Sequence, residues 1–243
     1  MITALEAANQ VIESCGSTND LVRTLGEQGY PHGTWVSARV QEKGRGRLGR
    51  EWKTAQGNLF LSLLARIHDP KLWTWVPLAT AVGIVSCLRQ ELPGHDLAIK
   101  WPNDIFMNGL KAGGVLCEGC GSGSSAYIVV GIGLNCADVP THLDRPATSL
   151  GLSVDLIRPK IIEAVLEALF TLEKLGPKRL QDRYNELSFL KMGDPIEWDT
   201  SPFRGKLLGL GPSGELQVIL EVGQALSLYA EDVRVKAVPL TSA

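Results

Sequence analysis

The chain has 243 residues, 44% of them hydrophobic, with 24 basic and 26 acidic side chains and a formal net charge of −2. This composition is that of a globular protein with one large domain, or one large and one small domain. The acidic balance excludes a protein that coats nucleic acid, because such proteins carry a broad basic face. Any anion binding must therefore be local.

Two further features of the sequence indicate the cellular compartment of the protein and the oxidation state of its cysteines. The N-terminus has no basic stretch followed by an apolar core, and no run approaches about eighteen apolar residues. We therefore expect a cytoplasmic protein with no membrane contact. Five cysteines, an odd number, favour reduced thiols over a disulfide framework. Cys117 and Cys120 form an isolated C-x-x-C pair, which we interpret as buried thiols rather than a zinc or redox site.

The first half of the chain predicts helices, strands and a hairpin. Helical spacing and end signals predict a helix over Ser17–Gly29 and another that starts near Trp75 and ends near Leu92. Two β-branched or leucine-rich runs, Thr34–Gln41 and Asn58–Ile67, predict strands. Asn108 followed by Gly109, between apolar residues, is a strong hairpin signal.

The second half predicts a buried strand over 126–135, an amphipathic helix over Arg158–Gly176 and a short helix that ends near Leu187. From Lys191 onward, short alternating runs broken by glycine and Pro-Ser-Gly predict a small β barrel. The whole pattern predicts an α+β protein, with helices flanking a mixed, largely antiparallel sheet in residues 1–188 and a β module in residues 189–243.

The stretch GRGRLGREW, Gly44–Trp52, has the G-x-G-x-x-G spacing of a dinucleotide-binding turn. That turn needs a strand before it and a helix after it. A strand is predicted before it, but the eight residues that follow, ending at Gly57, are too few for a crossover helix. Asp69 lies about twenty residues beyond Gly49, as a ribose-binding acid would, but without a helix between them we treat this as coincidence. The sequence argues against a Rossmann site.

The same stretch favours a cationic loop. From Gln41 to Lys53 there are five basic and two acidic residues, and five minus two gives a local charge of +3. Three glycines give this segment little intrinsic order. One interpretation is a charged hairpin that faces water; the other is a flexible loop that closes over an anion through its arginines. Trp52 favours the second, because an aromatic ring beside arginines can stack on a base.

Four segments are polar or glycine-rich where packing alone would not require it: STN (Ser17–Asn19), QEKGRGRLGREW (Gln41–Trp52), the stretch from KWPNDI to KAGGVLCE (Lys100–Glu118), and GIGLN (Gly131–Asn135). Singly, most of them are also explained by helix caps and turns. Lys111 is the exception, because a lysine between a hairpin turn and an apolar strand is costly to bury without a partner.

Together and in this order, GRGRLGREW, KWPND, KAGGVL and GIGLN resemble the motifs of the biotin protein ligases. The resemblance extends over the chain from about Val11. It implies a catalytic domain of the class II aminoacyl-tRNA-synthetase and biotin-ligase type, followed by an SH3-like module over Asp194–Lys236. Some members carry a DNA-binding domain before the Ser-Thr-Asn motif. Only sixteen residues precede Ser17 here, so we expect a ligase that does not bind DNA.

The resemblance implies a two-step reaction. Biotin and ATP, with Mg²⁺, would form biotinyl-5′-AMP, and biotin would then pass to a lysine of the biotin carboxyl carrier protein of acetyl-CoA carboxylase. The oligomeric state is left open between monomer and homodimer. One alternative is a lipoate or octanoate ligase, which would share the core architecture. Another is a non-enzymatic module that senses a small molecule or binds nucleic acid, which the acidic balance disfavours.

The resemblance also implies residue roles. Lys111 would contact the biotin carboxylate and the α-phosphate, and Arg45 and Arg47 would close over the adenylate. Asp104 would be the candidate ligand of Mg²⁺, with a plain turn residue as the alternative. The residues implied for biotin binding are Ser17, Thr18, Asn19, Gln41, Arg45, Gly46, Arg47, Lys111 and Gly114. Those implied for nucleotide binding are Trp52, Asn103, Asp104, Gly131 and Asn135.

Overall fold

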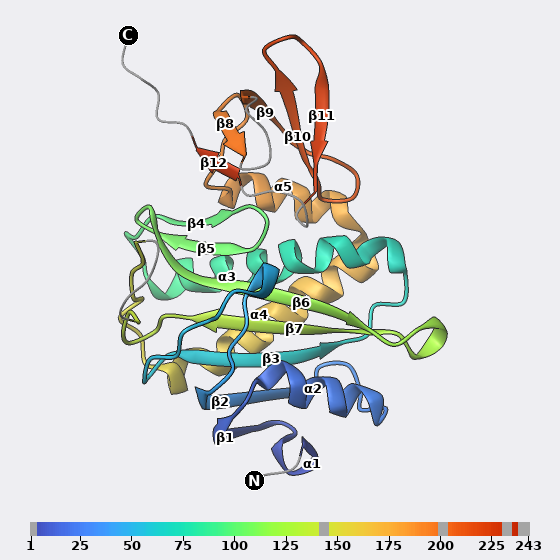
Figure 1. The fold of residues 1–243 in the computed structure, drawn as a ribbon, viewed down its shortest axis with the longest axis vertical. Helices are drawn as coiled ribbons and strands as arrows, with labels where there is room; N and C mark the ends of the chain where they lie inside the picture. Colours follow the sequence, from blue (N-terminus) through green and yellow to red (C-terminus); the bar gives the residue numbers. More distant parts are fainter. Residues whose placement is uncertain (1–3, 141–145, 199–203, 230–234, 238–243) are drawn as a thin grey trace.

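The computed structural model describes residues 4–140, 146–198, 204–229 and 235–237, which form two sheets and their helices (Figure 1). The larger sheet has seven strands in the order β1-β2-β3-β7-β6-β5-β4. Its strands are β1 (Gln10–Cys15), β2 (Trp35–Gln41), β3 (Leu59–Ala65), β4 (Leu97–Lys100), β5 (Asp104–Met107), β6 (Leu110–Cys120) and β7 (Tyr127–Leu134). Among these described strands, β1 and β2 pair parallel and all other neighbours pair antiparallel. The predicted α+β class with a mixed, largely antiparallel sheet is therefore confirmed.

The helices lie on both faces of this sheet. They are α1 (Ala4–Ala7), α2 (Thr18–Glu27), α3 (Val76–Glu91), α4 (Val154–Leu175) and α5 (Pro177–Leu187), with 3-10 turns η1 (Arg47–Gly49), η2 (Pro70–Trp75) and η3 (Gly123–Ser125). Because side chains alternate along a strand, Leu61 and Leu63 of β3 join the core with α3 and α4, whereas Leu64 joins the cluster under α2. In Figure 1, α4 passes behind β6, β7 and β3.

On the sheet face that α2 covers, the residues of β7 change from a buried valine to glycines. Val129 is fully buried in the cluster with α2, but the next two residues on this face are Gly131 and Gly133. A Cβ atom on Gly131 would lie 2.3 Å from Oδ1 of Asn19, in the first turn of α2. A Cβ on Gly133 would lie 2.6 Å from the Trp52 ring. The glycines thus let α2 and the loop before β3 approach the sheet closely, and a pocket forms between them.

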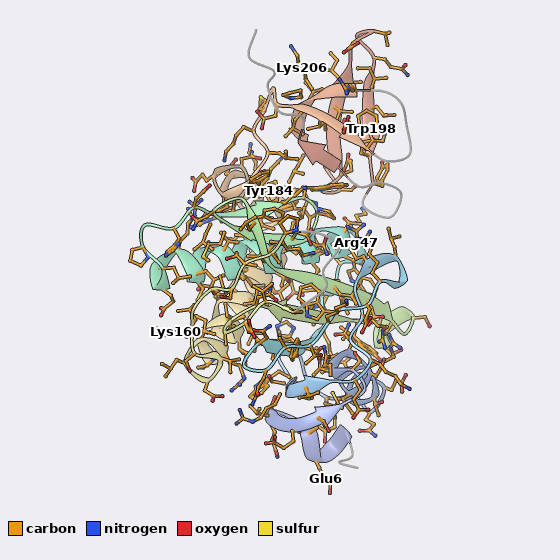
Figure 2. The ribbon with its side chains drawn as sticks, turned by 60° about the vertical axis from the view of Figure 1, so that its left-hand side comes forward. Glu6, Arg47, Lys160, Tyr184, Trp198 and Lys206 are labelled. Atoms are coloured by element: carbon orange, nitrogen blue, oxygen red, sulfur yellow. The ribbon has the colours of Figure 1, made fainter. Side chains whose placement is uncertain are left out.

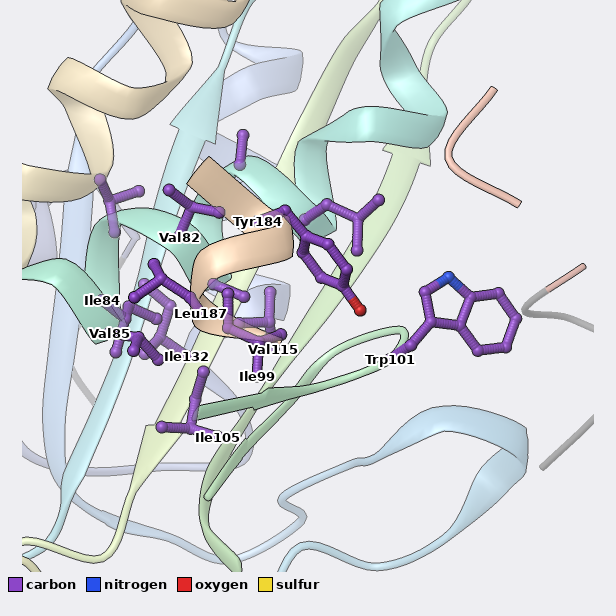
Figure 3. Close-up of a cluster of buried hydrophobic side chains, with 14 of the residues drawn as sticks. Val82, Ile84, Val85, Ile99, Trp101, Ile105, Val115, Ile132, Tyr184 and Leu187 are labelled. Carbon is purple, nitrogen blue, oxygen red and sulfur yellow. The ribbon is translucent and has the colours of Figure 1, made fainter. Parts of the chain in front are cut away.

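The helix α5 completes the main core on the opposite face. Figure 3 shows Tyr184 and Leu187 of α5 beside Ile99, Ile105 and Val115 of the sheet. All five side chains are at most 2% exposed. One helical stretch, Pro70–Glu91, is long and apolar enough to cross a bilayer, but two thirds of its most apolar window (67%) is buried, as in a core helix.

The smaller sheet has the strand order β11-β10-β9-β8-β12. Its strands are β8 (Pro195–Trp198), β9 (Arg204–Leu210), β10 (Leu216–Leu220), β11 (Ala225–Leu228) and β12 (Val235–Ala237), all paired antiparallel. This small sheet is consistent with the expected SH3-like module. The boundary between residues 188 and 189 stays a prediction.

Two indole N–H groups hold the turn between β9 and β10 against the larger domain. Trp75 Nε1 donates to the carbonyl of Pro212 at 2.9 Å, and Trp101 Nε1 donates to that of Gly214 at 3.0 Å. Both tryptophans are buried in the main core, which continues into Ile196 and Trp198. The module is thus joined to the larger domain by apolar packing and by two hydrogen bonds, one buried and one partly buried.

The Trp75 contact gives a first prediction. Trp75→Phe keeps most of the apolar surface but leaves the Pro212 carbonyl without its donor, so we expect a loss of about 1–3 kcal/mol in the free energy of unfolding. Urea unfolding followed by circular dichroism measures it. Trp35→Phe, at a half-buried indole, is the matched control and should change stability much less. An unchanged midpoint for Trp75→Phe would show that the bond does not stabilise the fold.

Two elements differ from the sequence predictions and one turn agrees with them. The strand β1 was not predicted, because only Ile12 of its six residues is buried and the alternation is weak. Helix α4 begins at Val154, four residues before the predicted Arg158, although Pro159 lies within it. The extra turn is stabilised because it buries Ile157, which is 3% exposed. The predicted turn at Asn108-Gly109 is present, with both residues at positive φ.

Candidate functional site

The pocket between α2, the 41–58 loop and the glycines of β6 and β7 has a cavity volume of about 160 Å³. Every predicted site residue except Asn135 lines it. The lining residues are Ser17, Thr18, Asn19, Gln41, Arg45, Gly46, Arg47, Arg50, Glu51, Trp52, Leu61, Lys100, Trp101, Pro102, Asn103, Asp104, Lys111, Gly114, Val115, Leu116, Gly131, Ile132 and Gly133. Residues separated by more than one hundred positions in the chain therefore share one site.

One end of the pocket is a buried hydrogen-bonded chain of neutral side chains. The backbone N–H and the hydroxyl of Thr18 lie 2.8 and 3.0 Å from Oε1 of Gln41. The Thr18 hydroxyl is also 2.7 Å from that of Ser62, and Ser62 donates to Oδ1 of Asn19 at 2.6 Å. Thr18, Asn19 and Ser62 are each less than 5% exposed. Such a group of donors and acceptors suits a neutral polar ligand in an otherwise enclosed space.

Beside this end lies a cluster of charges. The Arg45 guanidinium donates to both carboxylate oxygens of Asp20, at 2.6 and 2.9 Å. Glu118 contacts Arg23 at 3.1 Å and Arg45 at 3.8 Å. The Arg45 hydrogen bond holds the pKa of the Asp20 carboxyl below its usual value, and the same bond raises the pKa of Arg45. Arg45 is therefore held at the pocket entrance by carboxylates.

The cationic loop is more ordered than its glycines suggested. Arg45 and Glu51 form an antiparallel bridge, and Gly46 N–H donates to the Arg50 carbonyl at 2.7 Å. Two of the loop arginines have partners outside the loop: Arg45 pairs with Asp20, and Arg47 donates to Asn103 Oδ1 at 3.1 Å. The loop thus folds into a short hairpin over the pocket. Figure 2 shows Arg47 on the opposite side of the body from Lys160.

Trp52 lies inside the pocket against the sheet. Its ring packs on Gly133 and Gly114, and the Lys111 ammonium is 5.5 Å from the ring centroid. Among the described residues, its indole N–H is buried and has no hydrogen-bond partner. A drug-sized ligand needs about 300–1,000 Å³, more than this cavity holds. The indole and the loop must therefore shift before a large ligand fits.

Lys111 supplies a half-buried cation at the other end. It is the second residue of β6, its side chain is 29% exposed, and its Nζ contacts Asp104 Oδ1 at 2.5 Å. The expectation that this lysine needs a partner is thus met by Asp104. The Lys111 ammonium can therefore bind an anionic ligand by giving up its contact with the Asp104 carboxylate for one with the ligand.

The remaining predicted residues have structural contacts as well. Asn103 Nδ2 donates to the Val115 carbonyl, which ties the β4–β5 turn to β6. Asn135 lies outside the pocket lining, and its amide donates to the Thr148 carbonyl at 3.2 Å. The end of β7 thus carries this side chain toward the 146–152 segment. A direct contact between Asn135 and a nucleotide stays a prediction, and it would need this side chain to turn.

Metal-binding clusters are absent from the described part of the chain: no three His, Cys, Asp or Glu side chains gather there in a way that could hold an ion. Burial raises the pKa of the Cys117 thiol well above its ordinary value, which favours an inert protonated thiol. Both cysteines of the C-x-x-C pair are partly rather than fully buried, so the interpretation of the pair as buried thiols is met only in part.

Sequence reasoning missed three residues of the site. Ser62 is fully buried in the middle of β3, Glu118 contacts Asn19 from β6, and Gly133 lies under Trp52. Ser62 carried a signal, since it is the one polar residue within the run LFLSLLA of β3. Glu118 ends the KAGGVLCE segment, but nothing in the sequence indicated its partner Asn19, which lies 99 residues away.

Comparison with known proteins decides the family. The family model described as "Biotin/lipoate A/B protein ligase family" matches residues 11–135. The bifunctional ligase/repressor BirA of Bacillus subtilis is 30% identical over 237 residues, which cover 89% of this chain and 70% of that protein. This chain belongs to the biotin/lipoate A/B protein ligase family. The resemblance seen in the four motifs is thereby confirmed.

Other relatives of this family point the same way. The biotin–[acetyl-CoA-carboxylase] ligase of Mycobacterium tuberculosis is 34% identical over 146 residues, and that of Paracoccus denitrificans is 41% identical over 115 residues. The matches cover 58% and 46% of this chain, and the chain spans about half the length of each relative, 53% and 48%. The structure of the biotin protein ligase of Aquifex aeolicus in complex with biotin and ATP has a TM-score of 0.77 and 25% identity, and the match covers 94% of this chain and 98% of that one.

Proposed function

We propose that this chain is a biotin protein ligase, which activates biotin with ATP and transfers it to a lysine of a biotin carboxyl carrier protein. One observation carries the proposal: the cationic Lys111 and Arg47 line the same pocket as the neutral Thr18 and Asn19, which Ser62 joins by hydrogen bonds. Biotin has the matching halves, a carboxylate at one end and an uncharged cyclic urea at the other. Relatives named biotin–[acetyl-CoA-carboxylase] ligase support the same substrate and carrier.

The first step joins two anions. A biotin carboxylate oxygen attacks the α-phosphorus of ATP, the bond to the bridging oxygen breaks, and pyrophosphate leaves. Positive charge that is already in place lowers the barrier, because it stabilises the extra charge on the transferring phosphoryl group. Lys111 would contact the carboxylate and the α-phosphate, and Arg45 and Arg47 would leave Asp20 and Asn103 to close over the adenylate.

The second step needs little more than exclusion of water. The carrier lysine's amine attacks the carbonyl carbon of the mixed anhydride, AMP leaves with the electron pair, and the amine loses a proton. The 41–58 loop would protect the anhydride until the carrier binds. Trp52 would leave the sheet surface and stack on the adenine, which also frees its unpaired N–H from burial.

A magnesium ion fits the site only in a limited way. Asp104 is the pocket carboxylate that contacts Lys111, and that contact already uses one of its oxygens. Magnesium that arrives with ATP takes most of its ligands from phosphates and water, so one carboxylate is enough to hold it. It would supply further positive charge at the phosphates. Asp104 is its proposed ligand.

A lipoate or octanoate ligase is the alternative within the same family. It would bind a flexible acyl chain, which has no use for the polar Thr18–Ser62–Asn19 end. Pyrophosphate exchange into ATP, measured with biotin and with lipoate, separates the two functions. We expect exchange with biotin only, and label on one lysine of a carrier domain when that domain is added. Exchange with lipoate alone would overturn the proposal.

Three related expectations stay predictions. They are the cytoplasmic location, the absence of membrane contact and the absence of DNA binding. Some of its relatives are bifunctional repressors, so an electrophoretic shift assay at physiological salt is the relevant test. Monomer and homodimer are both compatible with the fold, and sedimentation distinguishes them.

Arg47→Gly gives a prediction that separates sealing from chemistry. Arg47 contacts the Asn103 side chain from the loop, so its loss should weaken loop closure rather than activation. We expect biotinyl-5′-AMP still to form but to escape, and lysines of a bystander protein to become labelled. Arg183→Gly, at an exposed ion pair on α5, is the control. Labelling confined to the carrier with Arg47→Gly would contradict the sealing role.

A further inference from the structure

Glu118 lies just outside the pocket, at the end of the buried hydrogen-bonded chain. It belongs to β6, its side chain is 25% exposed, and its Oε2 accepts from Asn19 Nδ2 at 2.6 Å. The chain leads from Thr18 through Ser62 to Asn19 and ends at this carboxylate. Three of its four members are buried, so water does not compete for their bonds.

A carboxylate at the end of such a chain determines its direction. An ionised carboxylate only accepts hydrogen bonds, so Asn19 must turn its amide nitrogen toward Glu118 and its oxygen toward Ser62. The single hydroxyl proton of Ser62 is then used on Asn19, so toward Thr18 the Ser62 oxygen can only accept; the Thr18 hydroxyl also lies within hydrogen-bond distance of Gln41 Oε1. One charge thus determines which way the Asn19 amide and the Ser62 hydroxyl point.

The Glu118 charge is compensated by two arginines, Arg23 of α2 and the pocket-lining Arg45. Arg23 contacts Glu118 Oε1 at 3.1 Å, and Arg45 lies 3.8 Å from Oε2. Arg23 and Arg45 also contact Asp20, at 3.8 and 2.6 Å. The arginine of the loop and the asparagine of the pocket therefore share the same carboxylate, which connects the loop position to the orientation of Asn19.

We propose that Glu118 is a positioning residue for biotin, which fixes the hydrogen-bonding direction of the Thr18–Ser62–Asn19 chain. The inference rests on the proposed function, in which that chain meets the urea of biotin. Glu118 does not line the pocket, so it acts through Asn19. A glutamine at this position has nearly the same shape but presents either an oxygen or an N–H, so it allows Asn19 to turn over and the chain to reverse.

The test is biotin binding by calorimetry, without ATP, for the wild type and Glu118→Gln. We expect Glu118→Gln to weaken biotin about tenfold, the effect of one charge-assisted hydrogen bond, and to leave the affinity for ATP unchanged. Glu118→Asp, which keeps the carboxylate, should recover part of the loss. Glu91→Gln is the matched control, because Glu91 has a similar exposure (28%) and pairs with Lys160 away from the pocket.

A double-mutant cycle distinguishes positioning from general structural damage. In the Asn19→Ala background, Glu118→Gln should cost no further biotin affinity, because its route to the ligand is gone. Thermal unfolding of each variant reports whether it folds. If the wild type binds no biotin, the proposed function itself fails. If the wild type binds and Glu118→Gln binds equally well, or if its loss persists in Asn19→Ala, the positioning role is overturned.

Discussion

Replacing Lys111 with alanine is expected to lower biotin-dependent pyrophosphate exchange by about a hundredfold or more, the usual cost of removing one charge-stabilising group from a transition state. The side chain is half-buried in the pocket, and Asp104 is its carboxylate partner. When the two anionic substrates meet there, the ammonium neutralises charge that water would otherwise have to solvate. The loss should appear in kcat and in kcat/KM alike, because the contact is strongest in the transition state.

Two comparisons isolate this effect. Lys160→Ala removes a lysine that pairs with Glu91 away from the pocket. It lowers the net charge by the same amount but does not alter the pocket, so pyrophosphate exchange should be unaltered. The Lys111 variant leaves Asp104 without its partner, and thermal unfolding reports the resulting change in stability. Near-normal exchange by a folded Lys111→Ala protein would exclude the proposed role.

The elements that sequence predicted well are those whose own residues determine them. Helix α2, strands β2 and β3, and the turn at Asn108-Gly109 agree with the prediction to within a few residues, because periodicity and turn chemistry are local. Strand β1 was missed because a weakly buried edge strand has little alternation. The start of α4 was misplaced because the burial of Ile157 outweighs the unfavourable effect of Pro159.

The residues of the site also fall into those that local sequence identified and those that it did not. Charged and glycine-rich motifs are local in the sequence, and they identified the loop, Lys111 and the Asn103–Asp104 turn, all of which line the pocket. The partners of those residues were not identifiable, because Asp20 and Ser62 match no motif, and Glu118, although it ends the KAGGVLCE segment, contacts residues far away in the sequence. A motif also does not determine where a residue at a strand end points, and the Asn135 side chain turns toward the neighbouring segment.

Gly131→Ala is expected to weaken biotin binding about a hundredfold and to leave ATP binding within about twofold, because it disturbs two hydrogen bonds of the Asn19 side chain, one buried and one partly buried, of about 1–3 kcal/mol each. The new Cβ would lie 2.3 Å from Oδ1 of Asn19, too close for any contact. Asn19 is 4% exposed and is held by Ser62 and Glu118. The methyl group therefore displaces the side chain at the polar end of the pocket.

The same substitution tests where Gly131 acts. Motif resemblance assigned this glycine to the nucleotide, whereas its contact with Asn19 assigns it to the biotin end. Calorimetry with biotin alone and with ATP alone separates these assignments. Gly16→Ala is the matched control, because no atom of the described residues lies within 4 Å of its added Cβ and its backbone is not in the left-handed region. Lost ATP affinity with normal biotin affinity would return Gly131 to the nucleotide site. The opposite result would show that β7 carries glycine here to make room for Asn19, whose side-chain amide is held by Ser62, the neighbour of Gly131 on β3, and by the carboxylate of Glu118.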